Sequence, residues 1–407
     1  MKRNLFIIIL LSLMPFIEIA AQKKEMNQAK TNIKEGKQLA ETEASLRGLL
    51  VDPTNRTNEK IWFLLFDAVK KQYEVCNEKM YLKQAVDTTH FFNSIYRMFG
   101  VLESIDSLDA QPDDKGRVKL KYRKRNSEYL HPLRANLFNG GLYFMGKKNY
   151  SHAFDLFSTY IDCYKQPLFE HYNYAQSDKR LSEAAFYAMH VAYMSNDVNK
   201  TLHYAPLAQE DTARLDLVYN YMAESYVQIA DTTNYLDVLQ SGFAKYPLYD
   251  YFFTHLFDYY FKHGNNDVAL ALCHDVVEHD SVNTVALYAM SSVLLEQNRY
   301  EECIDICNKL IELDDTNADA YYNAGIAYYN QAVALDNSKK YTKQERALML
   351  SLYRKALPYM KTYRSLKPEN KRQWVLPLYT IYLNLNMGKE FDEIDSIIKA
   401  ARAKQTK

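Results

Sequence analysis

The stretch TVALYAMSSVLLEQNRYEECIDICNKLIELDDTN, residues 284–317, decides the fold of this chain. Its apolar and small residues recur every three or four positions in both halves, which is the spacing of one buried helix face. We therefore predict two short helices joined by a turn, with small residues where the helices approach most closely. Counted from residue 284 as position 1, the pattern occupies positions 4, 7, 8, 11, 17, 20, 24 and 27: Leu287, Met290, Ser291, Leu294, Tyr300, Cys303, Cys307 and Leu310.

The same spacing returns along the chain. A unit of about 34 residues holds two short helices, but neither buries its apolar face without a stacked neighbour. The sequence therefore predicts a continuous stack of helix pairs. Five successive pairs open 34 residues apart, at Ser182, Asp216, Asp250, Thr284 and Ala318.

This pattern resembles the tetratricopeptide repeat, which has a large residue at position 4, Leu-Gly at 7 and 8, and Ala at 20. The resemblance spans roughly residues 23–402 and is firmest over 134–370. It implies an all-α fold, a right-handed α-solenoid of stacked antiparallel helix pairs. The copy that opens at Arg134 carries the pattern as Leu137, Gly140, Gly141, Phe144, Tyr150, Ala153, Phe157 and Tyr160.

The resemblance also predicts how the chain is divided. Residues 22–133 are predicted to form divergent helical repeats with a basic linker near 109–127. Residues 371–407 are predicted to form a capping helix pair. The last full copy has an insertion of 19 residues, and Pro358 is expected to bend its second helix. The predicted copies are 134–167, 182–215, 216–249, 250–283, 284–317 and 318–370.

The first 21 residues have the pattern of a secretory signal peptide. Two cations, Lys2 and Arg3, precede the apolar run 5–13, and Ala20 and Ala21 offer a small-residue cleavage site. The run is shorter than the roughly 20 apolar residues that span a membrane. We therefore expect export, with no membrane span after cleavage, to the periplasm of a Gram-negative bacterium.

The composition excludes several classes of function. The 50 basic and 50 acidic residues cancel, so the chain has no general positive field to attract nucleic acid. No P-loop, nucleophile elbow or dinucleotide fingerprint is present. We therefore predict a non-enzymatic protein with no catalytic residues and no cofactor.

Two clusters leave alternatives open. Cys273, Cys303 and Cys307 have the ligand type that suits a soft metal, but they occupy core positions of the repeat, so packing is favoured and no metal is expected. A dense run of basic residues could bind an anionic surface, although such runs more often form a solvated linker or helix face. Its members are Arg117, Lys119, Lys121, Arg123, Lys124 and Arg125.

The resemblance also implies a binding surface. In tetratricopeptide repeats the first helix of each pair lines the concave face, and positions 2, 5, 9, 12 and 13 point into the groove. A row of aromatic rings there suits an extended peptide or a partner helix. The groove candidates in this chain are Tyr251, Asp258, Phe261, Tyr288, Tyr322 and Tyr329.

These observations favour a protein- or peptide-binding scaffold of the bacterial periplasm or envelope. The alternative is a glycan-binding or accessory module of an envelope polysaccharide system, because tyrosine rings also lie well against pyranose faces. The sequence leaves the partner, the oligomeric state and the role of the insertion open.

Overall fold

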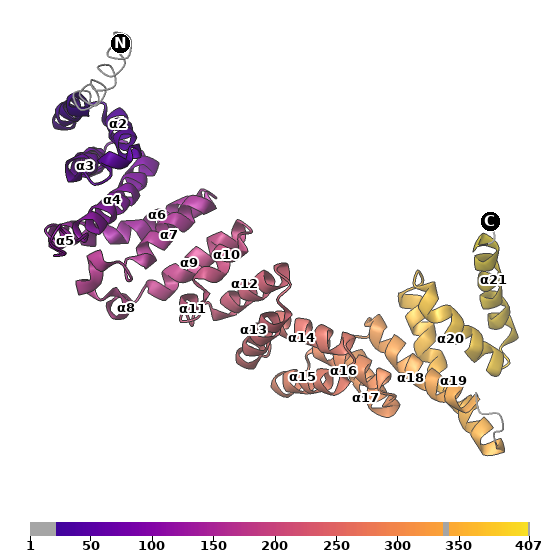
Figure 1. The fold of residues 1–407 in the computed structure, drawn as a ribbon. Coiled ribbons are helices and arrows are strands. Elements are labelled where there is room, and N and C mark those ends of the chain that lie inside the picture. The colour runs from indigo at the N-terminus through magenta and orange to yellow at the C-terminus, as the bar shows by residue number, and fades with distance from the viewer. Residues whose placement is uncertain (1–21, 337–341, 406–407) are drawn as a thin grey trace, which may run out of the picture. The chain divides into compact units, whose positions relative to one another are not determined.

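The computed structural model describes residues 22–336 and 342–405, and all regular structure in these residues is helical. The helices follow one another along the chain, joined by short turns and, at residues 110–122 and 163–180, by longer connections (Figure 1). They form two compact units, the first up to Asp231 and the second from Thr232. The predicted all-helical repeat fold is confirmed. The predicted signal peptide, residues 1–21, lies outside the described residues.

The first unit begins with a helix over residues 22–35. Helix α2 packs on α3, α3 on α4, α6 on α7, and α7 on α9, so neighbours in sequence bury each other's apolar faces. The α-helices that follow residues 22–35 are α2 (Leu39–Val51), α3 (Glu59–Tyr81), α4 (Thr88–Asp109), α5 (Arg123–Leu130), α6 (Arg134–Gly146), α7 (Tyr150–Asp162), α8 (Tyr174–Ser177), α9 (Leu181–Met194), α10 (Val198–His203), α11 (Ala205–Ala208) and α12 (Leu215–Gln228).

In the second unit, each helix packs on the next along the chain. From α14 onward, a helix that opens a repeat pair alternates with the helix that completes it. Its members are α13 (Thr232–Lys245), α14 (Asp250–Lys262), α15 (Asn266–His279), α16 (Thr284–Glu296), α17 (Tyr300–Leu313), α18 (Ala318–Asp336), α19 (Lys343–Leu366), α20 (Lys371–Asn384) and α21 (Gly388–Gln405).

The helix starts follow the predicted register. The five first helices α9, α12, α14, α16 and α18 begin within one residue of the predicted openings. Capping explains two of these starts, because the side chains of Asn283 and Asn317 accept hydrogen bonds from the backbone N–H groups of Ala286 (3.0 Å) and Ala320 (3.1 Å). The same cap thus recurs one repeat later. The division between the two units falls within the copy 216–249, between α12 and α13.

The core of residues 284–317 is packed as the pattern predicts. Leu287, Ser291, Cys303, Cys307 and Leu310 are all fully buried. The thiol of Cys303 donates to the carbonyl oxygen of Ser291 at 3.3 Å, so α16 and α17 approach closely at positions 8 and 20. Small residues are needed there for that reason.

The copy 182–215 differs from a regular helix pair. Its second half forms two short helices, α10 and α11, that meet at Tyr204. Pro206 lies in the first turn of α11 and has no backbone N–H, so it cannot extend the hydrogen-bond ladder of α10. The preceding connection also contains short helical segments, a 3-10 turn over Pro167–Tyr172 and α8.

The insertion near residue 340 lengthens both helices of its pair. Helix α18 has 19 residues and α19 has 24. Helix α19 begins at a capping box, in which the Thr342 hydroxyl accepts from the Glu345 backbone N–H at 3.1 Å. It continues without interruption through Pro358. Residues 337–341, between these two helices, lie outside the described residues.

Replacing Gly325 by leucine is expected to destabilise the second unit. A Cβ atom at this position would lie 2.6 Å from Met360 Sδ and 3.3 Å from Tyr359 Cβ, both on α19. Overpacking of this kind costs about 1–3 kcal/mol, which thermal unfolding followed by circular dichroism measures. Gly48→Leu is the matched control, because a Cβ on this helical glycine meets no atom within 4 Å. Equal melting temperatures for the two variants would contradict the register at α18.

Candidate functional site

Three of the predicted groove residues lie on neighbouring first helices of the second unit. Helix α16 packs directly on α18. Tyr288 on α16 is 41% exposed. On α18, the ring of Tyr322 lies 5.0 Å from that of Tyr363, and the Tyr329 hydroxyl lies 3.4 Å from Thr380 Oγ1. The structure therefore brings these three tyrosines onto one pair of packed helices.

The other three candidates lie on α14 and contact their own helix. The ring of Tyr251 is 4.4 Å from that of His255, and Phe261 stacks on Phe257 at 5.4 Å. Asp258 is exposed and pairs with Lys262 at 3.0 Å. These side chains give α14 an aromatic surface of its own, and this helix packs on α13 and α15.

We call Tyr288, Tyr322, Tyr329, Val285 and Ile326 the tyrosine shelf. Its α18 members pack against the buried core between α18, α19 and α20, which restricts their motion. Val285 is 41% exposed and adds apolar surface beside Tyr288. Burial raises the pKa of Tyr288 and of Tyr322, so both hydroxyls stay protonated at neutral pH and are able to donate a hydrogen bond.

The two helices of the shelf are joined by a buried amide. The Asn323 Nδ2 group donates to Ser291 Oγ at 2.9 Å, and Ser292 Oγ lies 3.4 Å from the same nitrogen. Asn323 itself is only 5% exposed. It therefore fixes α18 on α16 and does not act as a ligand-binding group.

The predicted basic linker is tied to the protein itself. Arg123 makes two 2.8 Å hydrogen bonds to the buried carboxylate of Asp106 on α4. The guanidinium of Arg125 lies 5.1 Å from the ring of Phe63 on α3. These contacts hold α5 on α3 and α4. The carboxylates that pair with Arg117, Lys121 and Lys124 are those of Asp113, Glu59 and Glu128.

The cysteines are packed in the core. Cys303 and Cys307 are fully buried with their sulfur atoms 4.0 Å apart, and burial raises the pKa of Cys273 to about 12. Thiols with raised pKa values are poor nucleophiles and poor metal ligands. In the part of the chain that the structure describes, no three His, Cys, Asp or Glu side chains come together as a metal site.

A second candidate site lies in the first unit, and the sequence predicts no functional role for any of its residues. It is a pocket of about 480 Å³, and α4 contributes most of its lining residues. Helical spacing places Tyr96, Gly100 and Glu103 on one strip of α4 and Arg97 and Ser104 on the strip beside it. The residues that line the pocket come from α2, α3, α4 and α7: Arg47, Trp62, Tyr96, Arg97, Gly100, Val101, Glu103, Ser104 and Thr159.

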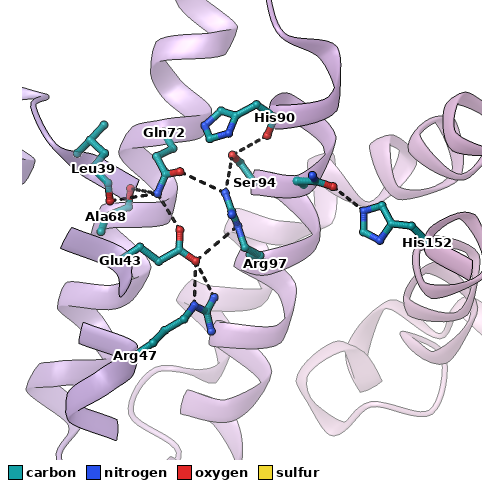
Figure 2. A network of polar contacts seen from close by, with 10 residues as sticks. Leu39, Glu43, Arg47, Ala68, Gln72, His90, Ser94, Arg97 and His152 are labelled. Atoms are coloured by element: carbon teal, nitrogen blue, oxygen red, sulfur yellow. Dashed lines mark hydrogen bonds and ion pairs between the residues drawn. The ribbon is translucent and has the colours of Figure 1, made fainter. Parts of the chain in front are cut away.

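The arginines of this pocket share one carboxylate (Figure 2). The Glu43 side chain is 7% exposed, accepts from Arg47 Nε at 2.9 Å, and lies 3.6 Å from Arg97 Nε. Gln72 Nε2 donates to the other oxygen of Glu43 at 2.8 Å, and Arg97 donates to Gln72 Oε1 at 3.2 Å. Burial lowers the pKa of Arg97, yet an arginine stays charged in a protein. The two arginines and the Glu43 carboxylate together carry a net charge of about +1.

The pocket also contains a carboxyl group without a cation. The Glu103 side chain has no hydrogen bond or ion pair to any described residue, and only its backbone oxygen accepts one, from Ser107 Oγ at 3.0 Å. Burial, followed by the nearby carboxylates of Asp162 and Asp106, raises the pKa of Glu103 to about 7. Asp106 is already paired with Arg123, and Asp162 accepts from the Tyr204 hydroxyl at 3.0 Å. Glu103 therefore titrates near neutral pH.

The sequence contained one signal of this pocket, namely a glycine inside a helix. Gly100 lies in the interior of α4, where glycine destabilises a helix by about 1 kcal/mol relative to alanine. A Cβ atom on Gly100 would meet nothing within 4 Å, so packing does not require the glycine. The arginines gave no signal, because Arg47 and Arg97 lie in the part of the chain that is out of register with the repeats.

The fold and these surfaces define a class, an all-helical array of the tetratricopeptide-repeat type. Residues 292–338 match the family model described as TPR repeat. Proteins with this repeat generally bind peptides or proteins and are typically non-enzymatic. A search of curated proteins gave no match. Within the described residues, no helix has the length and apolar character needed to cross a membrane.

Several solved structures are similar to this chain at low sequence identity. YrrB, described as a TPR protein with an unusual peptide-binding site, is 18% identical over 48% of this chain and 91% of its own, with a TM-score of 0.35. The C-terminal part of a TPR repeat-containing protein from Cytophaga hutchinsonii is 11% identical over 63% and 92%, with a TM-score of 0.42. A TPR repeats protein from Bacteroides fragilis is 14% identical over 65% and 98%, with a TM-score of 0.29.

Proposed function

We propose that this protein is a non-enzymatic scaffold that holds a protein or peptide partner on the tyrosine shelf. The observation that carries the proposal is the placement of Tyr288, Tyr322 and Tyr329 on two packed first helices. Tyrosine offers a large, stiff contact area and loses little side-chain entropy on binding. The core beneath Tyr322 and Tyr329 restricts these rings further, so the shelf is formed before a partner arrives.

The chemistry of the shelf indicates what the partner presents to it. Val285 and Ile326 lie beside the rings and favour an apolar anchor residue. The protonated hydroxyls of Tyr288 and Tyr322 are matched by hydrogen-bond acceptors, such as the backbone carbonyl groups of an extended peptide. A peptide with one or two apolar side chains and free backbone carbonyls fits both requirements.

We infer that the partner lies in the periplasm or envelope. The inference rests on Lys2, Arg3 and the apolar run 5–13, with small residues before Gln22. N-terminal sequencing of the protein isolated from cell fractions tests it. A mature chain that begins at Gln22 in the periplasmic fraction is expected, and an intact chain in the cytoplasm would contradict the inference.

A photo-crosslinking amino acid at position 288 tests the binding surface in cells that express the protein. We expect adducts with one protein partner, and the crosslinked partner segment is then synthesised as a peptide. Tyr288→Ala is expected to weaken binding of that peptide at least tenfold, as for a tyrosine at the centre of an interface. Fluorescence anisotropy measures the affinity.

Tyr81 provides the matched control, since it is 86% exposed and lies at the end of α3 in the first unit. The same crosslinker at position 81 is expected to give no such adduct, and Tyr81→Ala is expected to leave peptide binding unchanged. Equal adducts at positions 81 and 288 would show that the shelf is not the binding surface.

A further inference from the structure

We propose that the pocket over Gly100 binds a small sugar acid, whose carboxylate is held by Arg47 and Arg97 and whose hydroxylated ring lies across α4. This site is in the first unit and is independent of the tyrosine shelf in the second. The proposal rests on the charge balance of the arginines, the open space at Gly100 and the arrangement of donors and acceptors around the pocket.

The charge balance calls for a single negative charge. Among the described residues, Glu43 is the only carboxylate that pairs with Arg47 or Arg97. One ligand carboxylate would therefore balance the remaining positive charge. Arg47 and Arg97 would then face two carboxylates, that of Glu43 and that of the ligand. Arginine suits this task because its planar fork matches the geometry of a carboxylate. A phosphate dianion would leave an excess negative charge in a pocket that also contains the Glu103 carboxyl group.

The open space at Gly100 gives the ligand ring its place. The pocket volume of about 480 Å³ is large enough for one sugar ring with its substituents. A side chain at position 100 would extend into this space, since its Cβ would have no neighbour within 4 Å. The glycine is thus unfavourable for the helix and unnecessary for packing, and it keeps the middle of the pocket free.

On α4, the donor Arg97 lies about two helical turns from the acceptors Glu103 and Ser104. Arg47 and Arg97 are donors. The hydroxyl groups of Ser104 and Thr159 donate to the backbone oxygens of Gly100 (2.7 Å) and Asp155 (2.8 Å), so their own oxygens remain free to accept. The Glu103 carboxylate is also an acceptor when ionised. A ligand that fits has an anionic acceptor at one end and hydroxyl donors at the other.

Aromatic side chains complete the walls. The indole N–H of Trp62 already donates to the carbonyl oxygen of Arg56 at 2.8 Å, so Trp62 offers the ligand its apolar ring. Tyr96 lies on the same strip of α4 as Gly100 and contacts the His152 ring at 5.6 Å. Aromatic rings suit the C–H surface of a sugar ring, whose hydroxyl groups point outward.

Isothermal titration calorimetry on the full chain tests the proposal with three probes that share one ring. D-glucuronate is expected to bind saturably and at least ten times more tightly than D-glucose, which lacks the carboxylate. Glucose 6-phosphate is expected to bind more weakly than glucuronate. The proposal is overturned if glucuronate shows no saturable heat, if glucose binds equally well, or if the phosphate ester binds most tightly.

Variants locate the site. Gly100→Leu fills the pocket and is expected to abolish glucuronate binding, while Gly48→Leu, also at a helical glycine with open space around it, is expected to retain it. Arg47→Met removes the more exposed arginine and is expected to weaken binding at least tenfold. Circular dichroism confirms folding of each variant. Unchanged affinity in folded Gly100→Leu or folded Arg47→Met would overturn the proposal, and neither result bears on the shelf.

Discussion

Replacing Arg134 by methionine is expected to lower the free energy of unfolding by about 3–5 kcal/mol, because the change leaves a poorly solvated carboxylate without its cation. The side chains of Arg134 and Asp178 are only 7% and 11% exposed, and their charged atoms lie 2.6 Å apart. The Arg134 guanidinium also donates to the carbonyl oxygen of Tyr160, from Nε at 3.1 Å and from Nη2 at 2.9 Å. Methionine has a similar length and supplies none of these hydrogen bonds.

The loss extends beyond the ion pair. The guanidinium lies between two aromatic rings, 3.8 Å from the centre of Tyr160 and 4.0 Å from that of Tyr174. The Tyr174 hydroxyl in turn lies 2.7 Å from His131 Nδ1. Arg134 on α6 therefore ties down α8, which belongs to the irregular connection between two repeats. Without it, this connection loses the ion pair and the ring contact that Arg134 makes from α6.

Urea denaturation followed by circular dichroism measures the change, and Arg299→Met is the matched control. Arg299 also forms a two-pronged ion pair, with Glu302 at 2.7 and 2.6 Å, but both side chains are exposed. Exposed pairs contribute little, so this variant is expected to unfold close to the wild type. If both variants unfolded at the same urea concentration, the clamp around Arg134 would not stabilise the fold.

Arg134 also marks the limit of what the repeat pattern predicts. The register placed it as the first residue of a helix, and α6 does begin there. Its partner Asp178 lies 44 residues away, in the connection that interrupts the repeat spacing. A period reports the faces that neighbouring copies bury against each other, since those contacts recur. It carries no information about a contact that is made only once.

The same reasoning explains what was predicted of the two surfaces. The shelf was accessible from sequence because Tyr288, Tyr322 and Tyr329 occupy fixed positions of repeats in register. The contacts of Tyr322 and Tyr329 with α19 could not be predicted from the sequence, because the insertion changes the length of that helix. The pocket was missed for a different reason: Glu43, Gln72 and Arg97 come from three helices outside the regular repeats, and no spacing connects them.

Replacing Glu103 by glutamine is expected to stabilise the protein by about 3 kcal/mol at pH 8 and by about 1 kcal/mol at pH 5. The pKa of Glu103 is raised from 4.5 to about 7 in the folded chain, so the folded state binds the proton more tightly than the unfolded state. Stability from this group is therefore present below pH 4.5, falls as the pH rises, and is lost above about pH 7. Glutamine does not titrate and removes this loss.

Unfolding of the wild type and Glu103→Gln at both pH values isolates the effect of this one group, because every other titration is common to the two proteins. A difference that is equal at pH 5 and pH 8 would contradict the raised pKa. Glu59→Gln is a suitable control, because the Glu59 carboxylate pairs with Lys121 at 3.8 Å and its replacement should give no gain in stability at pH 8. A carboxyl group that weakens the fold at neutral pH has no use in packing. Its place beside Gly100, a second residue that packing does not require, is what a binding pocket explains.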